Sequence, residues 1–343
     1  MIQSFTSSAA LRAVLVACAL GWFASPVVAQ TEVWTSLRIQ QELDTRGVCQ
    51  LPAGNHNINV PIRLRAGNRL VGTGYNTRLN YTGGGPIAIV FGEVGAHNFA
   101  CYLDNISLLG GGVKVAAYAQ HCAIERVWIN GSSGDGLRID GVGERLKVSH
   151  VICWDNAGHG FAVRSTGSNN GVFFDHCSAQ ENGGFGLYLE TAAQNASLNG
   201  CVVRDCTFQS NGDGGQVYAE VLIRGFVGAT RFENVWIENT APHMRVGIRT
   251  EGISYAQPTG GPIVRRPGRV VFVGNNTISL MPRAIEFVDC FECVIDQLQA
   301  APATAQVRWR SAPGGGDAIG CTRPRGDMLL LPATQLIADP LLR

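Results

Sequence analysis

The sequence predicts an all-β solenoid, a single-stranded parallel β-helix, and three observations support this. A motif of eight residues returns at intervals of about one coil. Short strands with alternating apolar and polar residues follow glycine turns, as in Gly136–Asp140 and Gly160–Arg164. Each repeat is too short to contain the helical crossover that other parallel sheets require. Such units cannot bury an apolar face alone, so they must stack on one another.

The repeated motif has apolar or small residues at positions 1, 3, 6 and 8, and polar residues at positions 4 and 5. Successive copies begin 21, 24, 26, 29 and 29 residues apart. Because alternate side chains of a strand face opposite sides, the pattern buries one side of every copy. The copies are Cys101–Leu108, Cys122–Ile129, Leu146–Cys153, Val172–Ala179, Cys201–Phe208 and Thr230–Ile237, with a seventh at Cys293–Ala300.

The segment before the repeats predicts a helical cap and carries a family resemblance. Thr35–Leu43 has helical spacing, and we expect this helix to cover the open end of the solenoid. It is followed by Leu51–Gly54 (LPAG), the apolar strand Pro61–Leu64, and Leu70–Gly74 (LVGTG) with Thr77–Leu79. This succession resembles the opening of the pectate-lyase-like superfamily of right-handed β-helices, over roughly Thr35 to Ala300. The resemblance implies the fold but no single activity, since the superfamily includes lyases, hydrolases, epimerases and phage tail proteins.

Two kinds of turn residue recur between the strands. Asn156, Asn182 and Asn211 each follow position 8 of their copy by three residues. We expect them in the left-handed conformation, with each amide bonded to the asparagine of the next coil. Glycines flank the turn before each alternating strand, and we expect them to supply positive φ angles. These glycines are Gly134, Gly136, Gly158, Gly160, Gly184 and Gly186.

The chain divides into three predicted parts. Residues 1–29 read as a secretory signal, with Arg12, a short apolar core and small residues before a cut after Ala29. A lipoprotein cut at Cys18 is the alternative, and it fits less well because the chain stays apolar beyond it. Residues 30–311 form the β-helix, with a Gly- and Pro-rich loop at Tyr255–Pro267, and residues 312–343 form a terminal cap. The expected location is the periplasm or the medium, and no transmembrane segment is predicted.

Charge and cysteine content limit the partners. The formal net charge is +1, and nothing indicates the basic patch that a nucleic-acid partner would require. Cys101 and Cys122 share a repeat position on neighbouring coils, as do Cys177 and Cys206. Each pair could form a disulfide in an oxidising compartment or remain as small buried thiols. No zinc site is predicted, because the CxxC at 290–293 has no second pair.

The candidate site lies on the strands that follow the glycine turns, because superfamily members that act on polysaccharides bind them there. Alternation predicts outward columns on these strands. The columns are Asp135, His159 and Phe185; Arg138, Ala162 and Tyr188; and Asp140, Arg164 and Glu190. Asp213, Tyr218 and Glu220 are expected to continue them, with Arg249 and Glu251 outward on a later strand.

Two chemistries fit these columns. β-Elimination of a uronate needs a cation beside the sugar carboxylate and a group that moves the α-proton. Arg138 or Arg164 could neutralise the carboxylate, and His159 or Tyr188 could take or return the proton. Hydrolysis needs a pair of carboxylates. Those available for hydrolysis are Asp135, Asp140, Glu190, Asp213 and Glu220.

One enzyme resemblance is partial. Gly158–Gly160 resembles the GHG of polygalacturonases, and Gly134–Gly136 stands in the place of their GDD. The remaining motifs differ, because Gly110–Gly112 replaces NTD and Leu187–Leu189 replaces RIK. The DPHD motif of alginate epimerases is also missing. The resemblance therefore does not predict polygalacturonase activity.

We predict an exported polysaccharide lyase that cleaves a uronate-containing glycan in a groove along the β-helix. The catalytic candidates are His159, Tyr188, Asp135 and Arg164, and the substrate-binding candidates are Arg138, Asp140, Glu190, Tyr218, Glu220 and Arg249. The alternatives are a glycoside hydrolase of the same fold, a non-catalytic carbohydrate-binding scaffold, or an epimerase role. Ca²⁺ could bridge enzyme and uronate through Asp135, Asp140 and Glu190, although no dedicated calcium motif is present. Any one of these charged residues could equally belong to a solvated strand face.

Two further groups lie on other faces. His150 and His176 share a repeat position and predict a structural polar stack. Trp128, Trp154 and Trp236 could be platforms on which sugars stack, or could pack against terminal or loop segments.

Overall fold

The computed structural model describes most of the chain after residue 32. The described residues are 33–92, 97–116, 118–140, 143–212, 218–239, 243–255, 263–288, 290, 292–295, 298–301, 306–310 and 336–337. The predicted signal segment 1–29 lies outside them, as does nearly all of the predicted C-terminal cap. The β-helix belongs to one compact unit, Trp34–Arg343.

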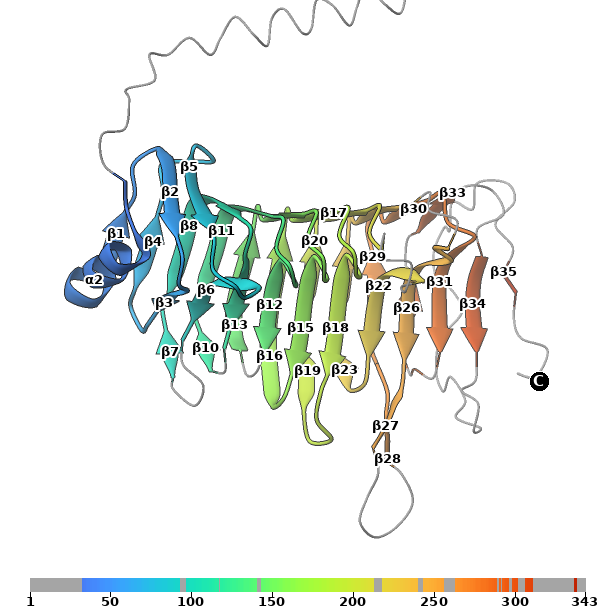
Figure 1. Ribbon diagram of the computed structural model, residues 1–343. Helices are drawn as coiled ribbons and strands as arrows, with labels where there is room; N and C mark the ends of the chain where they lie inside the picture. Colours follow the sequence, from blue (N-terminus) through green and yellow to red (C-terminus); the bar gives the residue numbers. More distant parts are fainter. Residues whose placement is uncertain are drawn as a thin grey trace, which may run out of the picture. The chain divides into compact units, whose positions relative to one another are not determined.

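Sheet B runs along one side of the solenoid, and its parallel strands stack in chain order (Figure 1). Its described strands are β3 (Ile62–Leu64), β6 (Ile87–Phe91), β9 (Gly112–Val115), β12 (Leu137–Asp140), β15 (Phe161–Ser165), β18 (Leu187–Thr191), β22 (Ala219–Arg224), β26 (Val246–Glu251), β31 (Arg283–Val288), β34 (Gln306–Arg310) and β35 (Leu336–Ile337).

Sheet A forms the rest of the wall and is also parallel. Along the repeats, each coil leaves sheet B, passes through two or three strands of sheet A, and returns to sheet B. The strands of sheet A are β1 (Val48–Gln50), β2 (Gly54–Ile58), β4 (Arg69–Val71), β5 (Thr77–Tyr81), β7 (Asn98–Phe99), β8 (Tyr102–Leu109), β10 (Ala119–Gln120), β11 (Ala123–Asn130), β13 (Gly143–Ser149), β14 (Ile152–Trp154), β16 (Ser168–Asp175), β17 (Ser178–Gln180), β19 (Ser197–Asn199), β20 (Val202–Arg204), β21 (Thr207–Gln209), β23 (Val227–Gly228), β24 (Arg231–Glu233), β25 (Trp236–Glu238), β29 (Val271–Val273), β30 (Thr277–Ser279), β32 (Val294–Ile295) and β33 (Gln299–Ala301).

The predicted parallel β-helix is confirmed by the register of the coils. Leu137 pairs with Phe161, and Phe161 pairs with Leu187 on the next coil. All three side chains are fully buried, so the interior is a continuous apolar column. Each coil lies about 4.8 Å from the next, which places like residues on top of one another.

The predicted helical cap is also confirmed, and it is slightly longer than expected. Helix α2 (Ser36–Arg46) begins after Thr35, whose hydroxyl accepts the Arg38 N–H. Gly47, with a φ of 72°, ends it in the left-handed conformation. Ile39 and Leu43 are buried on the face that packs against the solenoid. No helix among the described residues is both long and apolar enough to cross a membrane.

The asparagine ladder is present, but its backbone geometry differs from the prediction. The Asn156 amide donates to Asn182 Oδ1 at 2.8 Å, and the Asn182 amide donates to Asn211 Oδ1 at 2.7 Å. The left-handed residue is the one before each asparagine. The preceding residues are Asp155, Glu181 and Ser210, with φ of 52°, 54° and 54°. The asparagine side chains turn inward and are fully or almost fully buried, which explains their regular spacing.

The turn glycines serve close packing, and the prediction of positive φ at these positions was wrong. None of the six predicted glycines is among the positive-φ residues. A Cβ atom on Gly160 would lie 2.5 Å from the Ala179 Cβ and 2.9 Å from the Gly186 carbonyl oxygen. Neighbouring coils therefore approach too closely at this turn for any side chain.

Two features differ from the expected loops and disulfides. The described ends of the predicted loop Tyr255–Pro267 pair as an antiparallel hairpin of β27 (Ile253–Tyr255) and β28 (Ile263–Arg265). It projects beyond the strands of sheet B in Figure 1. Cys101, Cys122, Cys177 and Cys206, the two predicted pairs, are buried free thiols. Of the two alternatives, these residues adopt the role of small core side chains.

Candidate functional site

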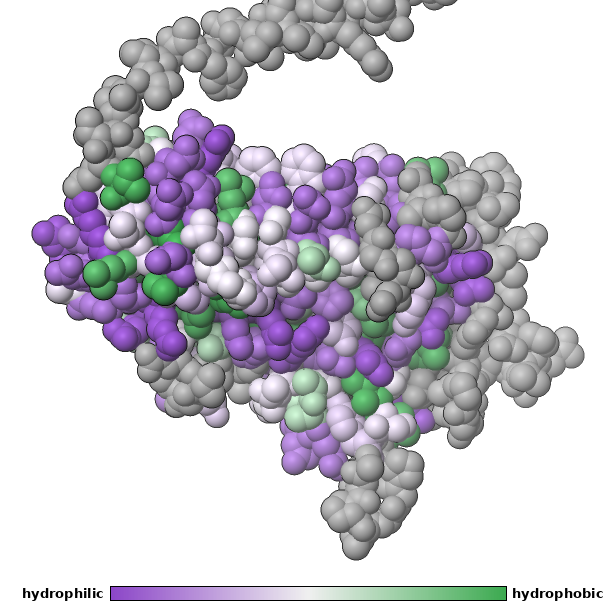
Figure 2. Space-filling model, in the orientation of Figure 1, coloured by the Kyte–Doolittle hydropathy of each residue, from purple (hydrophilic) through white to green (hydrophobic). Residues whose placement is uncertain are grey.

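The exposed side of sheet B presents three rows of side chains, in the register that the alternation predicted. The end row runs through Asp140, Arg164, Glu190, Arg224 and Glu251, and the middle row through Lys114, Arg138, Ala162, Tyr188, Leu222 and Arg249. The turn row comprises Asp135, His159, Phe185, Ala219 and Val246. Figure 2 shows a hydrophilic band over the lower part of these strands and paler, less polar surface above it.

His159 is held as a neutral imidazole. Its Nδ1 accepts the backbone N–H of Phe185 at 2.9 Å, so the ring proton lies on Nε2. Burial lowers the pKa of His159 to about 4; Asp135 favours protonation, and Arg164 and Arg138 oppose it. The Asp135 carboxylate in turn accepts the backbone N–H of His159 at 2.9 Å. His159 is therefore arranged to donate a hydrogen bond from Nε2 and not to accept a proton.

An aromatic cluster fills the centre of this face. The His159 ring lies 5.2 Å from Phe185 and 4.9 Å from Tyr188, measured between ring centroids. Tyr188, predicted to point outward, does so but is only 7% exposed because Phe185 and Leu222 pack around it. Burial and the neighbouring Glu190 carboxylate raise the pKa of Tyr188 to about 12. Its hydroxyl is therefore protonated at neutral pH.

Most charged side chains of the face are held in ion pairs. Asp140 pairs with Arg138 at 2.7 Å and with Lys114 at 3.2 Å. Arg224 lies between two carboxylates, 3.6 Å from Glu190 and 3.7 Å from Glu251. An acid catalyst must keep its proton until the substrate arrives, and a cation next to the carboxyl group opposes this. Asp140 and Glu190 are therefore poorly placed as the acid of a hydrolase.

Arg164 differs from the other cations of the face. It lies between Asp140 and Glu190 in the register, yet no ion pair joins it to a described carboxylate. Its guanidinium carbon lies 5.5 Å from the centre of the Tyr188 ring. Its Nε is buried and has no hydrogen-bond partner, as is also true of Arg224 and Arg249, but those two side chains lie within ion-pair distance of carboxylates. An unsatisfied buried donor on a cation favours an anionic ligand at this position.

Tyr218 and Arg249 lie farther along the same face. The Tyr218 hydroxyl donates to the Glu251 carboxylate, and the Arg249 guanidinium lies 4.7 Å above the Tyr218 ring. Arg249 also forms an ion pair with Glu251 at 2.7 Å and donates a hydrogen bond to the fully buried Glu286 at 2.7 Å. Burial and Glu251 raise the pKa of Tyr218. These side chains form hydrogen bonds and ion pairs with one another, and this arrangement stabilises the face.

The prediction that Glu220 faces outward was wrong. It is fully buried, and its carboxylate accepts the Asn211 backbone N–H at 2.9 Å and the Asn211 amide at 2.7 Å. Asn239 also donates to it. Glu220 occupies the inward position of Gly186 one coil earlier, so it closes the asparagine ladder. Asp213 lies outside the described residues.

Sequence reasoning missed Arg224. The alternation in Val221–Arg224 contains its signal, because Arg224 follows Ile223 as Asp140 follows Ile139. The irregular segment at 213–217 concealed the register. The register of β18 with β22 places Arg224 next to Glu190, and so adds a cation to the end row.

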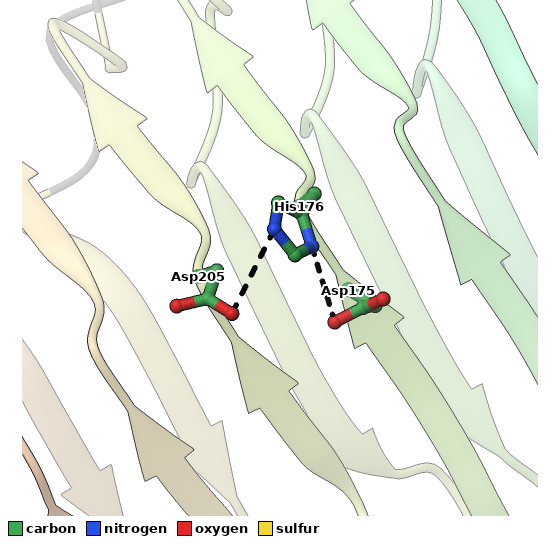
Figure 3. A group of neighbouring side chains, drawn as sticks. All are labelled: Asp175, His176 and Asp205. Atoms are coloured by element: carbon green, nitrogen blue, oxygen red, sulfur yellow. Dashed lines mark ion pairs between the residues drawn. The ribbon is translucent and has the colours of Figure 1, made fainter.

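The predicted calcium ligands do not form a cluster. Asp140 and Glu190 lie two coils apart with Arg164 between them. A group with metal-ligand spacing occurs instead on a bend of sheet A, where Asp175, His176 and Asp205 lie together (Figure 3). The His176 Nδ1 faces Asp175 at 3.3 Å and its Nε2 faces Asp205 at 3.8 Å.

This bend is better explained as a run of ion pairs. Arg204 donates to the same Asp175 oxygen at 2.8 Å, so positive charge is already present. Although burial opposes it, the Arg204 guanidinium and His176 lower the pKa of Asp175. His176 also stacks on His150, with ring centroids 4.9 Å apart and planes 4° from parallel. The predicted histidine stack is therefore confirmed.

The coil geometry and this face define a class of protein, the right-handed parallel β-helices. Residues 87–255 match the family model described as right handed beta helix region. The chain therefore has the right-handed parallel β-helix fold that its resemblance to the pectate-lyase-like superfamily predicted. No sequence relative was found among curated proteins.

Solved structures with this fold are distant in sequence. The ORF18 protein of Geobacillus virus E2 is 13% identical with a TM-score of 0.54, and the match covers 99% of this chain and 66% of that one. The chain thus spans slightly less than two thirds of the phage protein. A mannuronan C-5 epimerase A-module from Azotobacter vinelandii is 14% identical, with a TM-score of 0.47, over 89% and 96% of the two chains. Tailspike protein 2 of an Escherichia coli O157:H7 bacteriophage is 13% identical, with a TM-score of 0.49, over 82% and 41%.

Proposed function

We propose that the protein binds an acidic polysaccharide along the exposed face of sheet B and cleaves it by β-elimination. The observation that carries the proposal is Arg164, the arginine of this face that forms no ion pair with a described carboxylate and whose Nε has no hydrogen-bond partner. It lies in an end row where the other described cations and carboxylates are paired. A uronate carboxylate is an anion of the right size to accept from a guanidinium. The His159 Nε2–H and the Tyr188 hydroxyl would donate to the same sugar.

Proton transfer is assigned to Tyr188. Its hydroxyl has the Glu190 carboxylate and the Arg224 guanidinium as neighbours. The phenol proton is lost to water while Arg224 stabilises the phenolate, which then removes the proton α to the sugar carboxylate. The C–O bond to the leaving sugar breaks, an unsaturated uronate forms, and the regenerated phenol returns its proton to the leaving oxygen. Hydrolysis has less support because the end-row carboxylates are ion-paired.

The test is incubation of the protein with polygalacturonate, alginate and an uncharged glucan. Ultraviolet absorbance of the unsaturated product and new reducing ends are followed together. We expect both to rise with an acidic polymer, and we expect Arg164→Gln and Tyr188→Phe to abolish the rise while the fold is retained. Arg231→Gln, on sheet A, is the matched control. Reducing ends without absorbance would establish hydrolysis, and binding without turnover would establish a scaffold; either result contradicts the lyase proposal.

A further inference from the structure

A second surface, on sheet A, has a different chemistry from the face of sheet B. It comprises the outward side chains of the short strands β14, β17, β21 and β25. Their register gives two rows. We call this surface the tryptophan strip: Ile152, Ser178, Thr207 and Trp236 in one row, and Trp154, Gln180, Gln209 and Glu238 in the other.

The two tryptophans of the strip are exposed, and their rings are held in place. Trp154 is 37% exposed and Trp236 is 52% exposed. The indole N–H of Trp154 donates to Glu181 at 2.7 Å, and that of Trp236 donates to Glu238 at 3.1 Å. Each ring offers a flat apolar face to solvent while its polar edge is satisfied, which suits stacking against a sugar ring.

Trp154 is supported from behind. Its ring stacks on Trp128, with centroids 6.0 Å apart and planes 14° from parallel. Trp128 in turn meets the edge of Tyr75, at 6.4 Å and 84°. The stack orders Trp154 before any ligand arrives, so binding would cost little side-chain entropy. Trp128 packs on other aromatic rings, and Trp154 forms the outer, exposed end of this stack.

The side chains between the two tryptophans are uncharged hydrogen-bonding groups. Trp154 and Trp236 lie on strands three coils apart, a distance of about 14 Å along the axis at the usual strand spacing. The intervening coils present Ser178 with Gln180, and Thr207 with Gln209, all partly exposed. Hydroxyl and amide groups both donate and accept, as sugar hydroxyls do. No cation of the strip would compensate a carboxylate.

We propose that the tryptophan strip binds an uncharged polysaccharide that lies along the solenoid axis. The apolar faces of two sugar rings would stack on Trp154 and Trp236, and the hydroxyls between them would bond the amides and hydroxyls. The occupant is a neutral glycan because the strip is uncharged between its aromatic ends. This site is independent of the face of sheet B, and it would hold the protein on a neutral matrix beside its acidic substrate.

The experiment is affinity electrophoresis of the protein through gels containing hydroxyethyl cellulose, laminarin or galactomannan, with polygalacturonate as the acidic comparison. We expect at least one neutral polymer to retard the wild type. Trp154→Ala and Trp236→Ala should each weaken that retardation on the order of tenfold, the effect of removing one aromatic stacking contact. Phe173→Ala is the matched control, because Phe173 is also exposed, at 38%, on another strand of sheet A.

Arg164→Gln separates the two proposals, since it should leave retardation by the neutral polymer unchanged. Absence of retardation in every neutral gel would overturn the inference, and so would equal retardation of the tryptophan variants. Sedimentation tests whether a second copy of the protein, instead of a glycan, covers the strip. A dimer of the wild type that dissociates in the double tryptophan variant would show that a second copy covers the strip, which also overturns the inference.

Discussion

His159 contributes to stability in a way that depends on pH. Its pKa is about 4 in the folded protein, below its ordinary value of 6.5, so the unfolded chain binds more protons between these values. Its contribution is complete above pH 6.5 and is lost as the pH falls toward 4. We expect the wild type to lose on the order of 2 kcal/mol of unfolding free energy over that window, relative to His159→Asn.

Urea unfolding at neutral pH and near pH 4 measures this difference. Asparagine can still accept the Phe185 N–H but does not titrate, so the variant should lack the slope. His150→Asn, at an exposed histidine of sheet A, is the control and should behave as the wild type does. Equal pH slopes in the wild type and His159→Asn would contradict the assignment of a neutral, buried imidazole.

The turns between coils depend on glycine for close approach. Gly160→Ala should lower the unfolding free energy by about 1–3 kcal/mol, because its Cβ would meet Ala179 and the Gly186 carbonyl of the next coil. Gly84→Ala is the matched control, since a Cβ there has no atom within 4 Å. Urea denaturation of both variants makes the comparison. If the two substitutions have the same effect, the turn is looser than the distances at Gly160 require.

The strands, and which of their side chains point inward or outward, could be predicted from the sequence. The contacts between individual side chains could not. Alternation placed Leu137 inward and Arg138 outward without error, because period two is a property of every strand. It misplaced Glu220, because the sequence before β22 lacks the regular glycine turn of the earlier coils. It also gave no account of the His159 tautomer or the unpaired Arg164 Nε, which depend on side chains one coil away. The ion pairs of the end row could not be predicted either, because they also join side chains of neighbouring coils.

The solenoid has an open end that helix α2 covers. Ile39 is fully buried under the helix, while Leu37 on the same helix is 78% exposed. Ile39→Asp should displace the cap and lower the unfolding free energy by roughly 3 kcal/mol, since it buries an unpaired charge. It should also promote association through the uncovered strand edges. Leu37→Asp should do neither.

Thermal unfolding and light scattering check this prediction. An Ile39→Asp protein that stays monomeric and as stable as Leu37→Asp would indicate that the first coils close the solenoid by themselves. The comparison is clean because both substitutions introduce the same charge on one helix.

The hydrogen bonds of the asparagine ladder all run in one direction along the solenoid. Within it, each amide donates forward and accepts from behind, so one more coil with the same asparagine would leave no bond unmade. Both Glu220 oxygens accept hydrogen bonds from Asn211, so the chain of asparagine side chains ends at this residue. A lengthened protein is therefore best made by duplicating residues 157–182, upstream of that carboxylate. Such a duplication would extend both proposed binding faces by one coil, about 4.8 Å.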